Sequence, residues 1–148
     1  MPKTQTQDGR RALLLLPLAA GGLYLLSHDR TPRVRVEIKE VLLDEAKLLI
    51  SAGALVLDVR ERAAYEARHI PGALLAPLGE LPSLLAGSLA YAKAKSIIVY
   101  CGNGSTLGPD GTRVLVATGF AGAVNLRPGI QGWAEAGLPV EKGRGRQA

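Results

Sequence analysis

The single cysteine of the sequence, Cys101, has the surroundings of a reactive thiol. It follows an apolar run, 96–100, and opens a segment, 102–106, that reads Gly-Asn-Gly-Ser-Thr. Small residues let such a loop curl until several backbone N–H groups converge on one centre and bind an anion. Near the start of a helix, these amides favour a thiolate and would hold an anionic donor or a persulfide. We therefore take Cys101 as the candidate nucleophile. The candidate anion-binding loop consists of Gly102, Asn103, Gly104, Ser105 and Thr106.

A second group of polar residues stands at the end of another apolar run. Residues 54–57 are apolar, and Asp58 and Arg60 follow them. Ligands of open parallel sheets bind beyond the carboxyl ends of the strands, so we expect these two side chains to lie near Cys101. We predict that they form a buried ion pair there. Arg113, further along the chain, is a candidate for a positive charge close to the loop.

The apolar pattern predicts an α/β fold in which strands and helices alternate. Apolar stretches bounded by turn residues predict strands over 54–59, 73–76, 96–100 and 123–126. Amphipathic or apolar segments predict helices over 41–52, 62–68, 81–92, 112–118 and 130–136. Strands that are connected through helices by short loops pair in parallel, with right-handed crossovers.

The first part of the sequence has the pattern of a membrane-targeting segment. A basic stretch ending in Arg10 and Arg11 precedes residues 12–26, which carry no charge. A helix of that length rises roughly 22 Å, less than the ~30 Å hydrocarbon core of a bilayer. The pattern is typical of a secretory signal or an uncleaved signal anchor, and a buried helix packed on the domain is the alternative. We expect a membrane-anchored or exported protein on the periplasmic or extracytoplasmic side, or else one at the cytoplasmic face of the membrane.

These patterns divide the chain into three parts. Residues 1–33 hold a basic N-terminus, the hydrophobic segment and a linker; 34–142 hold the globular domain; and 143–148 are expected to form a basic flexible tail. The net charge of +5 comes from the flanks, because residues 40–141 hold 8 Lys or Arg and 10 Asp or Glu. Basic flanks beside an apolar run indicate a membrane surface rather than nucleic acid. A single cysteine cannot form an intrachain disulfide, and together with the two histidines it does not give the spacing of a zinc site. We therefore predict neither a metal nor a cofactor.

Three ordered motifs resemble those of the rhodanese-like domain family. The first reads Asp-Val-Arg-Glu at 58–61, with Tyr65 and then His-Ile-Pro-Gly-Ala at 69–73; another spans 125–140, and the cysteine loop lies between them. The resemblance covers nearly all of the globular part. It implies a central five-stranded parallel sheet flanked by helices. It also implies transfer of a sulfane sulfur from a small-molecule donor, through a persulfide on Cys101, to a thiol or cyanide acceptor.

Details of the loop refine this resemblance. The loop is most similar to that of 3-mercaptopyruvate sulfurtransferases, which also have glycine after the cysteine. Thiosulfate-using relatives commonly carry a basic residue there, whereas Gly102 has no charge. Residues 107–111 differ from the immediate helix start that is usual in the family, so we expect the next helix to begin late, near Asp110 or Thr112.

Two other functions fit parts of the pattern. Phosphatases and arsenate reductases related to this family close a longer loop with an arginine, but Leu107 stands at that position of a C-x5-R motif. A non-catalytic, membrane-tethered binding module would keep the fold, and the intact Cys101 argues against it. Of the remaining motif residues, His69 is expected to fix a turn and Trp133 to fill the core.

Overall fold

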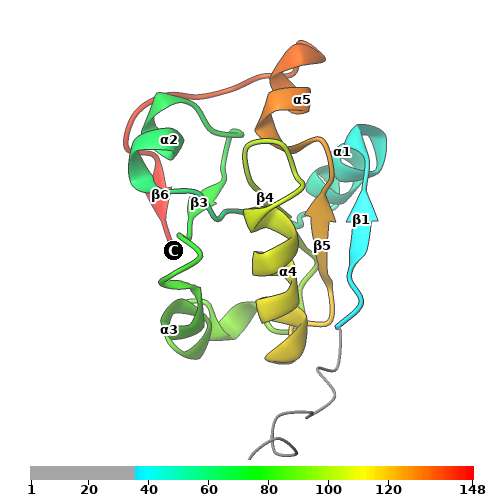
Figure 1. Ribbon diagram of the computed structural model, residues 1–148, viewed down its shortest axis with the longest axis vertical. Coiled ribbons are helices and arrows are strands. Elements are labelled where there is room, and N and C mark those ends of the chain that lie inside the picture. Colours follow the sequence, from blue (N-terminus) through cyan, green and yellow to red (C-terminus); the bar gives the residue numbers. More distant parts are fainter. Residues whose placement is uncertain (1–35) are drawn as a thin grey trace, which may run out of the picture. The chain divides into compact units, whose positions relative to one another are not determined.

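The computed structural model describes residues 36–148, which form a parallel sheet covered by helices (Figure 1). The strands in this part of the chain are β1 (Lys39–Val41), β2 (Leu55–Asp58), β3 (Leu74–Leu75), β4 (Ile97–Tyr100), β5 (Ala123–Leu126) and β6 (Arg146–Gln147). The helices are α1 (Leu43–Ser51), α2 (Arg62–Ala67), α3 (Leu81–Ala86), α4 (Leu107–Ala117) and α5 (Gly129–Glu135), with a 3-10 turn, η1 (Ala90–Ala92). The strand order is β1-β5-β4-β2-β3-β6, and every pair is parallel. The predicted α/β class and parallel pairing are confirmed.

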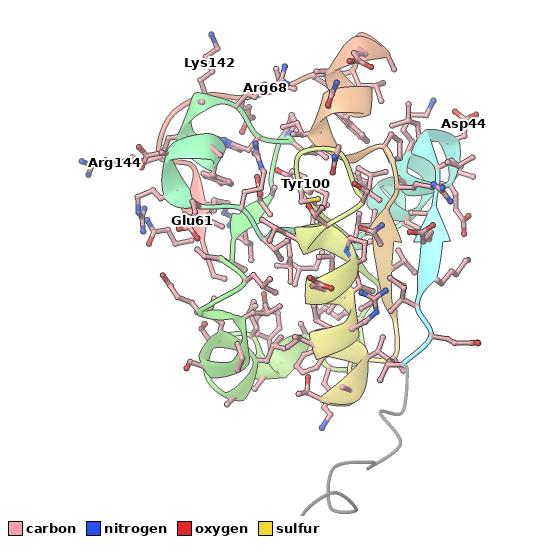
Figure 2. The ribbon with its side chains drawn as sticks, in the orientation of Figure 1. Asp44, Glu61, Arg68, Tyr100, Lys142 and Arg144 are labelled. Carbon is pink, nitrogen blue, oxygen red and sulfur yellow. The ribbon has the colours of Figure 1, made fainter. Side chains whose placement is uncertain are left out.

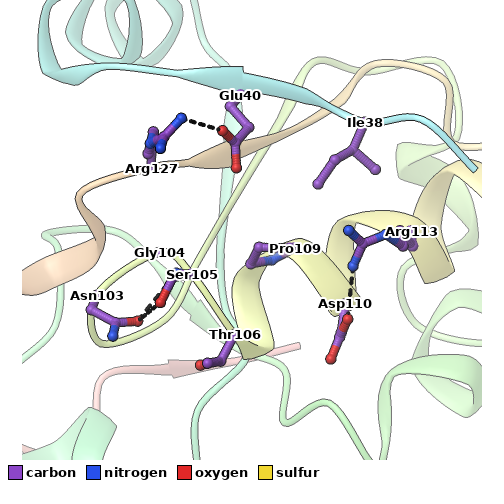
Figure 3. Close-up of a pocket in the computed structure, with 10 residues that line it drawn as sticks. All are labelled: Ile38, Glu40, Asn103, Gly104, Ser105, Thr106, Pro109, Asp110, Arg113 and Arg127. Carbon is purple, nitrogen blue, oxygen red and sulfur yellow. Dashed lines mark hydrogen bonds and ion pairs between the residues drawn. The ribbon is translucent and has the colours of Figure 1, made fainter.

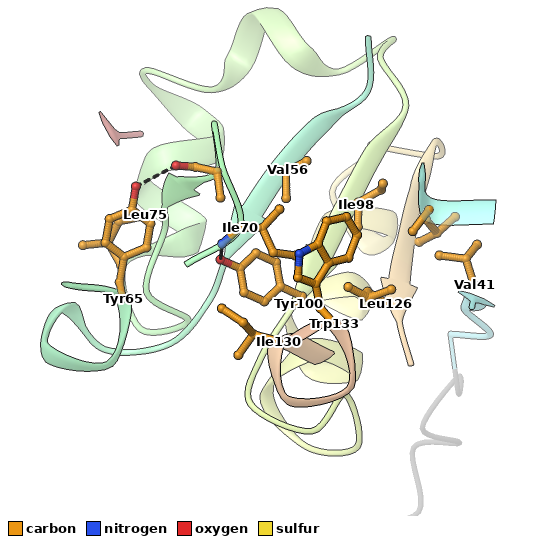
Figure 4. Close-up of a cluster of buried hydrophobic side chains, with 13 residues drawn as sticks. Val41, Val56, Tyr65, Ile70, Leu75, Ile98, Tyr100, Leu126, Ile130 and Trp133 are labelled. Carbon is orange, nitrogen blue, oxygen red and sulfur yellow. Dashed lines mark hydrogen bonds between the residues drawn. The ribbon is translucent and has the colours of Figure 1, made fainter. Parts of the chain in front are cut away.

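Alternation along β4 sorts its side chains onto the two faces of the sheet. Ile98 and Tyr100 belong to a cluster that α1, α2 and α5 cover, shown in Figure 4. Val99 and Cys101 belong to a second cluster, which lies against α3 and α4. Successive residues of a strand point to opposite faces, so the position of Cys101 after Tyr100 directs its side chain toward α4. Trp133 fills the first cluster, as predicted, and its Nε1–H donates to the Pro139 carbonyl at 2.8 Å.

The sheet has one strand more than the five predicted, and that strand comes from the end of the chain. In β6, Arg146 pairs with Leu74 of β3, and beyond it the Ala148 N–H donates to the Leu75 carbonyl at 3.1 Å. Residues 146–147, which lie in the segment 143–148 predicted to be a flexible tail, therefore extend the sheet. The segment has no apolar alternation, and backbone hydrogen bonds fix it instead. The Tyr65 hydroxyl adds a further contact, because it accepts the Arg146 N–H at 3.0 Å.

Helix α4 begins at Leu107, so the predicted late start near Asp110 or Thr112 is wrong. Proline is tolerated in the first turn of a helix, where its missing N–H has no partner to lose, and Pro109 lies in that turn. The Thr112 hydroxyl donates to the Gly108 carbonyl at 2.8 Å and closes the turn. The helix therefore presents its N-terminus to the cysteine loop directly.

The segment predicted as one helix over 81–92 is divided in the structure. Helix α3 ends at Ala86, and η1 follows after Gly87. The Gly87 N–H donates to the Ser83 carbonyl at 3.0 Å, which closes the last turn. Both pieces still bury their apolar residues, with Leu85 and Ala92 in the cluster beneath α4.

The predicted targeting segment lies outside the described residues. The hydrophobic helix expected over 12–26 and the linker that follows it both fall within residues 1–35. Within 36–148, no helix has the length and apolar character needed to cross a bilayer.

Candidate active site

Cys101 lies at the carboxyl end of β4, between the sheet and the start of α4. The residue is 1% exposed, and its side chain packs among the aliphatic residues of the second cluster. It also lines a cavity of about 480 Å³, together with Arg60 and the loop residues Gly102, Asn103 and Thr106. Cys101 is therefore almost fully buried and is also part of the cavity wall. Gly108 of α4 is its neighbour on the helix side, because a β-carbon built there would lie 3.4 Å from Sγ.

The carbonyl groups of the loop are held on the side of β5 and α5. The Ile130 N–H donates to the Cys101 carbonyl at 3.0 Å, and the Gln131 N–H donates to the Gly102 carbonyl at 2.9 Å. In a trans peptide, the C=O of one residue and the N–H of the next point in opposite directions, and the described chain has no cis peptide bond. The N–H groups of Gly102 and Asn103 are consequently directed away from α5.

The loop and the start of α4 offer a set of backbone donors. Among residues 36–148, no hydrogen-bond partner is found for the N–H groups of Gly102, Asn103, Gly104, Thr106, Leu107 and Gly108. The Ser105 N–H is different, because it donates to Asn103 Oδ1 at 3.1 Å, and the Ser105 hydroxyl donates to the same atom at 2.9 Å (Figure 3). Unpaired amides beside a helix N-terminus form a site suited to an anion. Binding of an anion by the loop stays a prediction from the sequence.

The position of Gly104 explains why the loop needs glycine there. Its φ is +74°, and a β-carbon on it would lie 1.7 Å from the Arg127 carbonyl oxygen. A side chain would therefore meet both an unfavourable backbone conformation and a direct clash. Gly104 allows the loop to rest on the connection between β5 and α5.

Asn125 of β5 holds the loop through a hydrogen bond, and it was not predicted from the sequence as a site residue. The side chain is fully buried in β5, and its Nδ2 donates to the Gly104 carbonyl at 2.8 Å and to Glu40 Oε1 at 3.2 Å. Its Oδ1 has no hydrogen-bond partner within the described part of the chain. A polar residue within the apolar run 123–126 was the available signal, since buried amides are normally hydrogen-bonded.

Asp58 and Arg60 form the predicted ion pair at the end of β2. Asp58 is fully buried and accepts Arg60 Nε at 2.9 Å and Nη2 at 2.6 Å, one on each oxygen. Burial lowers the pKa of Arg60, but the hydrogen bond and charge of Asp58 outweigh it, so the pKa is raised above its ordinary value. Arg60 Nη2 also donates to the Arg68 carbonyl at 2.8 Å. The pair thus lies beside Cys101, with the guanidinium already engaged.

Arg113 is not part of the cavity that Cys101 lines. It lines a neighbouring cavity of about 720 Å³ along the outer side of the loop, with Arg127 and Glu40 (Figure 3). Both arginines are paired: Arg113 with Asp110 at 2.8 Å, and Arg127 with Glu40 at 3.0 Å. The two cavities share Asn103 and Thr106, so the loop separates them. The structure therefore places Arg60 on the cavity that Cys101 lines, and Arg113 on the other side of the loop.

His69 is held in a structural arrangement away from the loop. Its ring stacks on Tyr65 with centroids 3.9 Å apart, and its Nδ1 lies 2.9 Å from the Tyr65 carbonyl. Its backbone pairs with Glu141 in both directions at 2.8 Å. This agrees with the predicted role in fixing the chain. Over the described residues, no group of three or more His, Cys, Asp or Glu side chains is placed to hold a metal ion.

The fold and the site together define an α/β domain with a cysteine loop between a buried strand and a helix N-terminus. Residues 42–136 match the family model described as the rhodanese-like domain, and the chain belongs to this family. The predicted family is therefore confirmed.

Relatives of the chain include sulfurtransferases. It is 31% identical to YibN, an uncharacterised protein of Escherichia coli (strain K12), over 73% of this chain and 76% of YibN. It is 29% identical to a protein of Allochromatium vinosum named sulfurtransferase, over 64% of this chain and 84% of that protein. Among solved structures, the human single-domain sulfurtransferase TSTD1 is similar with a TM-score of 0.58 and 31% identity, over 67% of this chain and 97% of TSTD1.

Proposed function

We propose that this protein is a sulfurtransferase in which Cys101 carries the transferred sulfur as a persulfide. The observation that carries the proposal is the set of unpartnered N–H groups on Gly102, Asn103, Thr106 and Leu107, four residues that line the same cavity as Cys101. Backbone N–H groups can donate hydrogen bonds to the negatively charged outer sulfur of a persulfide, and no residue has to transfer a proton to it. The sulfurtransferases among the relatives support the same reaction.

The reaction has two balanced steps. The Cys101 thiolate attacks the transferable sulfur of a donor, and the new S–S bond forms at Sγ. The donor's own bond to that sulfur breaks: the S–S bond of a persulfide or thiosulfate, with release of a thiolate or sulfite, or the C–S bond of 3-mercaptopyruvate, with release of the pyruvate enolate. An acceptor thiolate or cyanide then attacks the outer sulfur, and the Cys101 thiolate leaves. The N–H groups of the loop stabilise negative charge on the outer sulfur in both steps, and no redox partner is consumed.

In this proposal Asp58 and Arg60 are positioning residues. Their ion pair closes the end of β2, and Arg60 links it to the Arg68 carbonyl at the end of α2. Through these contacts the pair fixes one wall of the Cys101 cavity. Arg113 has no contact with that cavity, and we assign it no role in the reaction.

The test is a donor panel with matched active-site variants. Thiosulfate, 3-mercaptopyruvate and an organic persulfide are each supplied with cyanide or a thiol as acceptor, and the rate of sulfur transfer is measured. We expect transfer from at least one donor by the wild type, and none above background by Cys101→Ser. Equal rates in wild type and Cys101→Ser, or no transfer from any of the donors, would overturn the proposal. The panel also tests the predicted similarity of the loop to 3-mercaptopyruvate sulfurtransferases.

We further propose that the apolar segment 12–26 attaches the domain to a membrane or directs its export. The support is the sequence pattern alone: a basic stretch, then an uncharged apolar run, then the globular part. Fractionation of cells that express the full chain, with and without residues 12–26, tests it. Recovery of the full chain in the soluble cytoplasmic fraction would contradict it.

A further inference from the structure

The cavity that Cys101 lines offers an anionic donor little positive charge. Of the residues that line it, only Arg60 and Glu61 are charged, one with each sign. Arg60 is engaged, because both oxygens of Asp58 accept its hydrogen bonds and the Arg68 carbonyl accepts another. Its side chain is only 11% exposed. A bidentate partner of opposite charge cancels most of the field that Arg60 would otherwise present to a ligand.

Glu61 also lines this cavity, and its charge is opposite to that of Arg60. The residue is exposed and immediately precedes α2 (Figure 2). No ion pair or side-chain hydrogen bond to Glu61 is found within residues 36–148. The negative charge of Glu61 therefore repels an anionic donor that approaches Cys101, and dissolved salt weakens this repulsion.

The remaining wall next to α4 and α2 is apolar. Leu107, at the first position of α4, is 38% exposed and lines the cavity, as does the partly buried Ala64. An exposed aliphatic side chain at the rim favours the organic part of a ligand over a hydrated inorganic anion.

We infer that this protein takes its sulfur from an organic persulfide whose organic part is neutral or positively charged, and that Glu61 is the residue that discriminates against anionic donors. The inference rests on the proposed function, since it names the donor class of the same site. The step is the one given above: the Cys101 thiolate attacks the terminal sulfur of R–S–SH, Cys101 becomes a persulfide, and the thiolate R–S⁻ leaves. Glu61 acts on the approach of the donor and takes no part in bond making.

Two donors of similar size and opposite charge provide the test. Cysteamine persulfide carries an ammonium group, and 3-mercaptopropionate persulfide carries a carboxylate. The ratio of their kcat/KM values is measured at low ionic strength and again in 0.5 M salt. One unit charge that faces a donor across a solvated cavity changes kcat/KM by roughly several-fold for each donor, so we expect the wild type to prefer cysteamine persulfide by about tenfold.

Variants of two exposed glutamates separate the inference from a general charge effect. Glu61→Gln should bring the preference down at least threefold, and Glu61→Lys should reverse it, with both effects weakened in 0.5 M salt. The control Glu80→Gln removes the same charge from an exposed residue that does not line the cavity, and it should keep the wild-type ratio.

The failure of the inference is distinct from the failure of the proposed function. A ratio that Glu61→Gln leaves within twofold of the wild type, while both persulfides still transfer sulfur through Cys101, overturns the role of Glu61 and leaves the sulfurtransferase intact. A wild type that prefers the carboxylate donor overturns the donor class. Absence of sulfur transfer from every donor removes the proposed function, and this inference with it.

Discussion

Gly108, in the first turn of α4, faces the Cys101 sulfur closely enough that an added β-carbon would touch it. A β-carbon on Gly108 would be 3.4 Å from Sγ and 2.4 Å from Asn125 Oδ1. The Asn125 side chain in turn holds the Gly104 carbonyl of the loop. Helix, loop and β5 therefore meet at one residue without a side chain.

Gly108→Ala should disturb this junction. The added methyl group forces the buried Asn125 side chain to move, which overpacks the site and costs about 1–3 kcal/mol of unfolding free energy despite alanine's better helix propensity. Sulfur-transfer activity should fall with it, because the Gly104 carbonyl loses its partner. Urea denaturation and the donor assay measure the two effects. Gly79→Ala is the control, since a β-carbon there meets nothing within 4 Å, and a stability loss equal to that of Gly108→Ala would contradict this account.

Asp58→Asn should be strongly destabilising. Asp58 is fully buried, and its carboxylate is the partner of the largely buried Arg60 guanidinium. Neutralising it leaves a buried charge without compensation, which costs about 3 kcal/mol or more. Chemical denaturation measures the loss. Asp44→Asn, at an exposed ion pair with Lys47, should leave the midpoint unchanged, and equal midpoints for the two variants would show that the buried pair has no special importance.

Tyr100 should make the protein sensitive to alkaline pH. Burial, followed by the negative charge of Asp58, raises the pKa of Tyr100 well above its usual 10.0. The folded state therefore keeps the phenol neutral at a pH where the unfolded chain has lost the proton. Stability is fully present below about pH 10 and falls as the pH rises above it.

Tyr100→Phe tests that linkage. The variant should lose about 1–3 kcal/mol at pH 7, because the buried Ile70 N–H loses the hydroxyl that accepts it at 3.1 Å. Between pH 9 and pH 11 the variant should then lose less unfolding free energy than the wild type. Part of the loss should remain, because burial also raises the pKa of Tyr65. Denaturation series at several pH values provide the comparison, with Tyr91→Phe, at an exposed ring, as control. Parallel curves for wild type and Tyr100→Phe would refute the assignment.

The end of the chain should be ordered on the sheet. The N–H groups of Arg146 and Ala148 donate to Tyr65 and Leu75, so their hydrogen exchange should be slower than that of an unstructured peptide. Tyr65→Phe removes the acceptor of Arg146 and should speed its exchange more than that of Ala148. Exchange of both amides at the rate of a free peptide in the wild type would contradict β6.

Much of this arrangement follows from local sequence. The apolar runs ending in Asp58 and in Cys101 predict buried parallel strands, and parallel strands bring their carboxyl ends to one edge. The side of the sheet on which Cys101 lies follows from alternation along β4. The ion pair with Arg60 was predictable on the same grounds, because a buried carboxylate needs a partner.

The features that were missed depend on contacts between distant parts of the chain. Residues 146–147 have no strand pattern, and backbone hydrogen bonds to β3 fix them. The start of α4 at Leu107 depends on packing that brings Gly108 against Asn125, which outweighs the local preference of glycine and proline. The direction of the Arg113 side chain, away from the Cys101 cavity, depends on its position on α4, and that position was predicted wrongly together with the start of the helix.

The most direct test of the sulfur-carrying role of Cys101 is the intact mass of the protein after brief treatment with a sulfane donor. We expect a gain of one sulfur atom, located at Cys101 by peptide mapping, removed by cyanide with formation of thiocyanate, and missing in Cys101→Ser. A wild-type protein whose mass stays unchanged with every donor, or a Cys101→Ser variant that gains sulfur equally well, would contradict it.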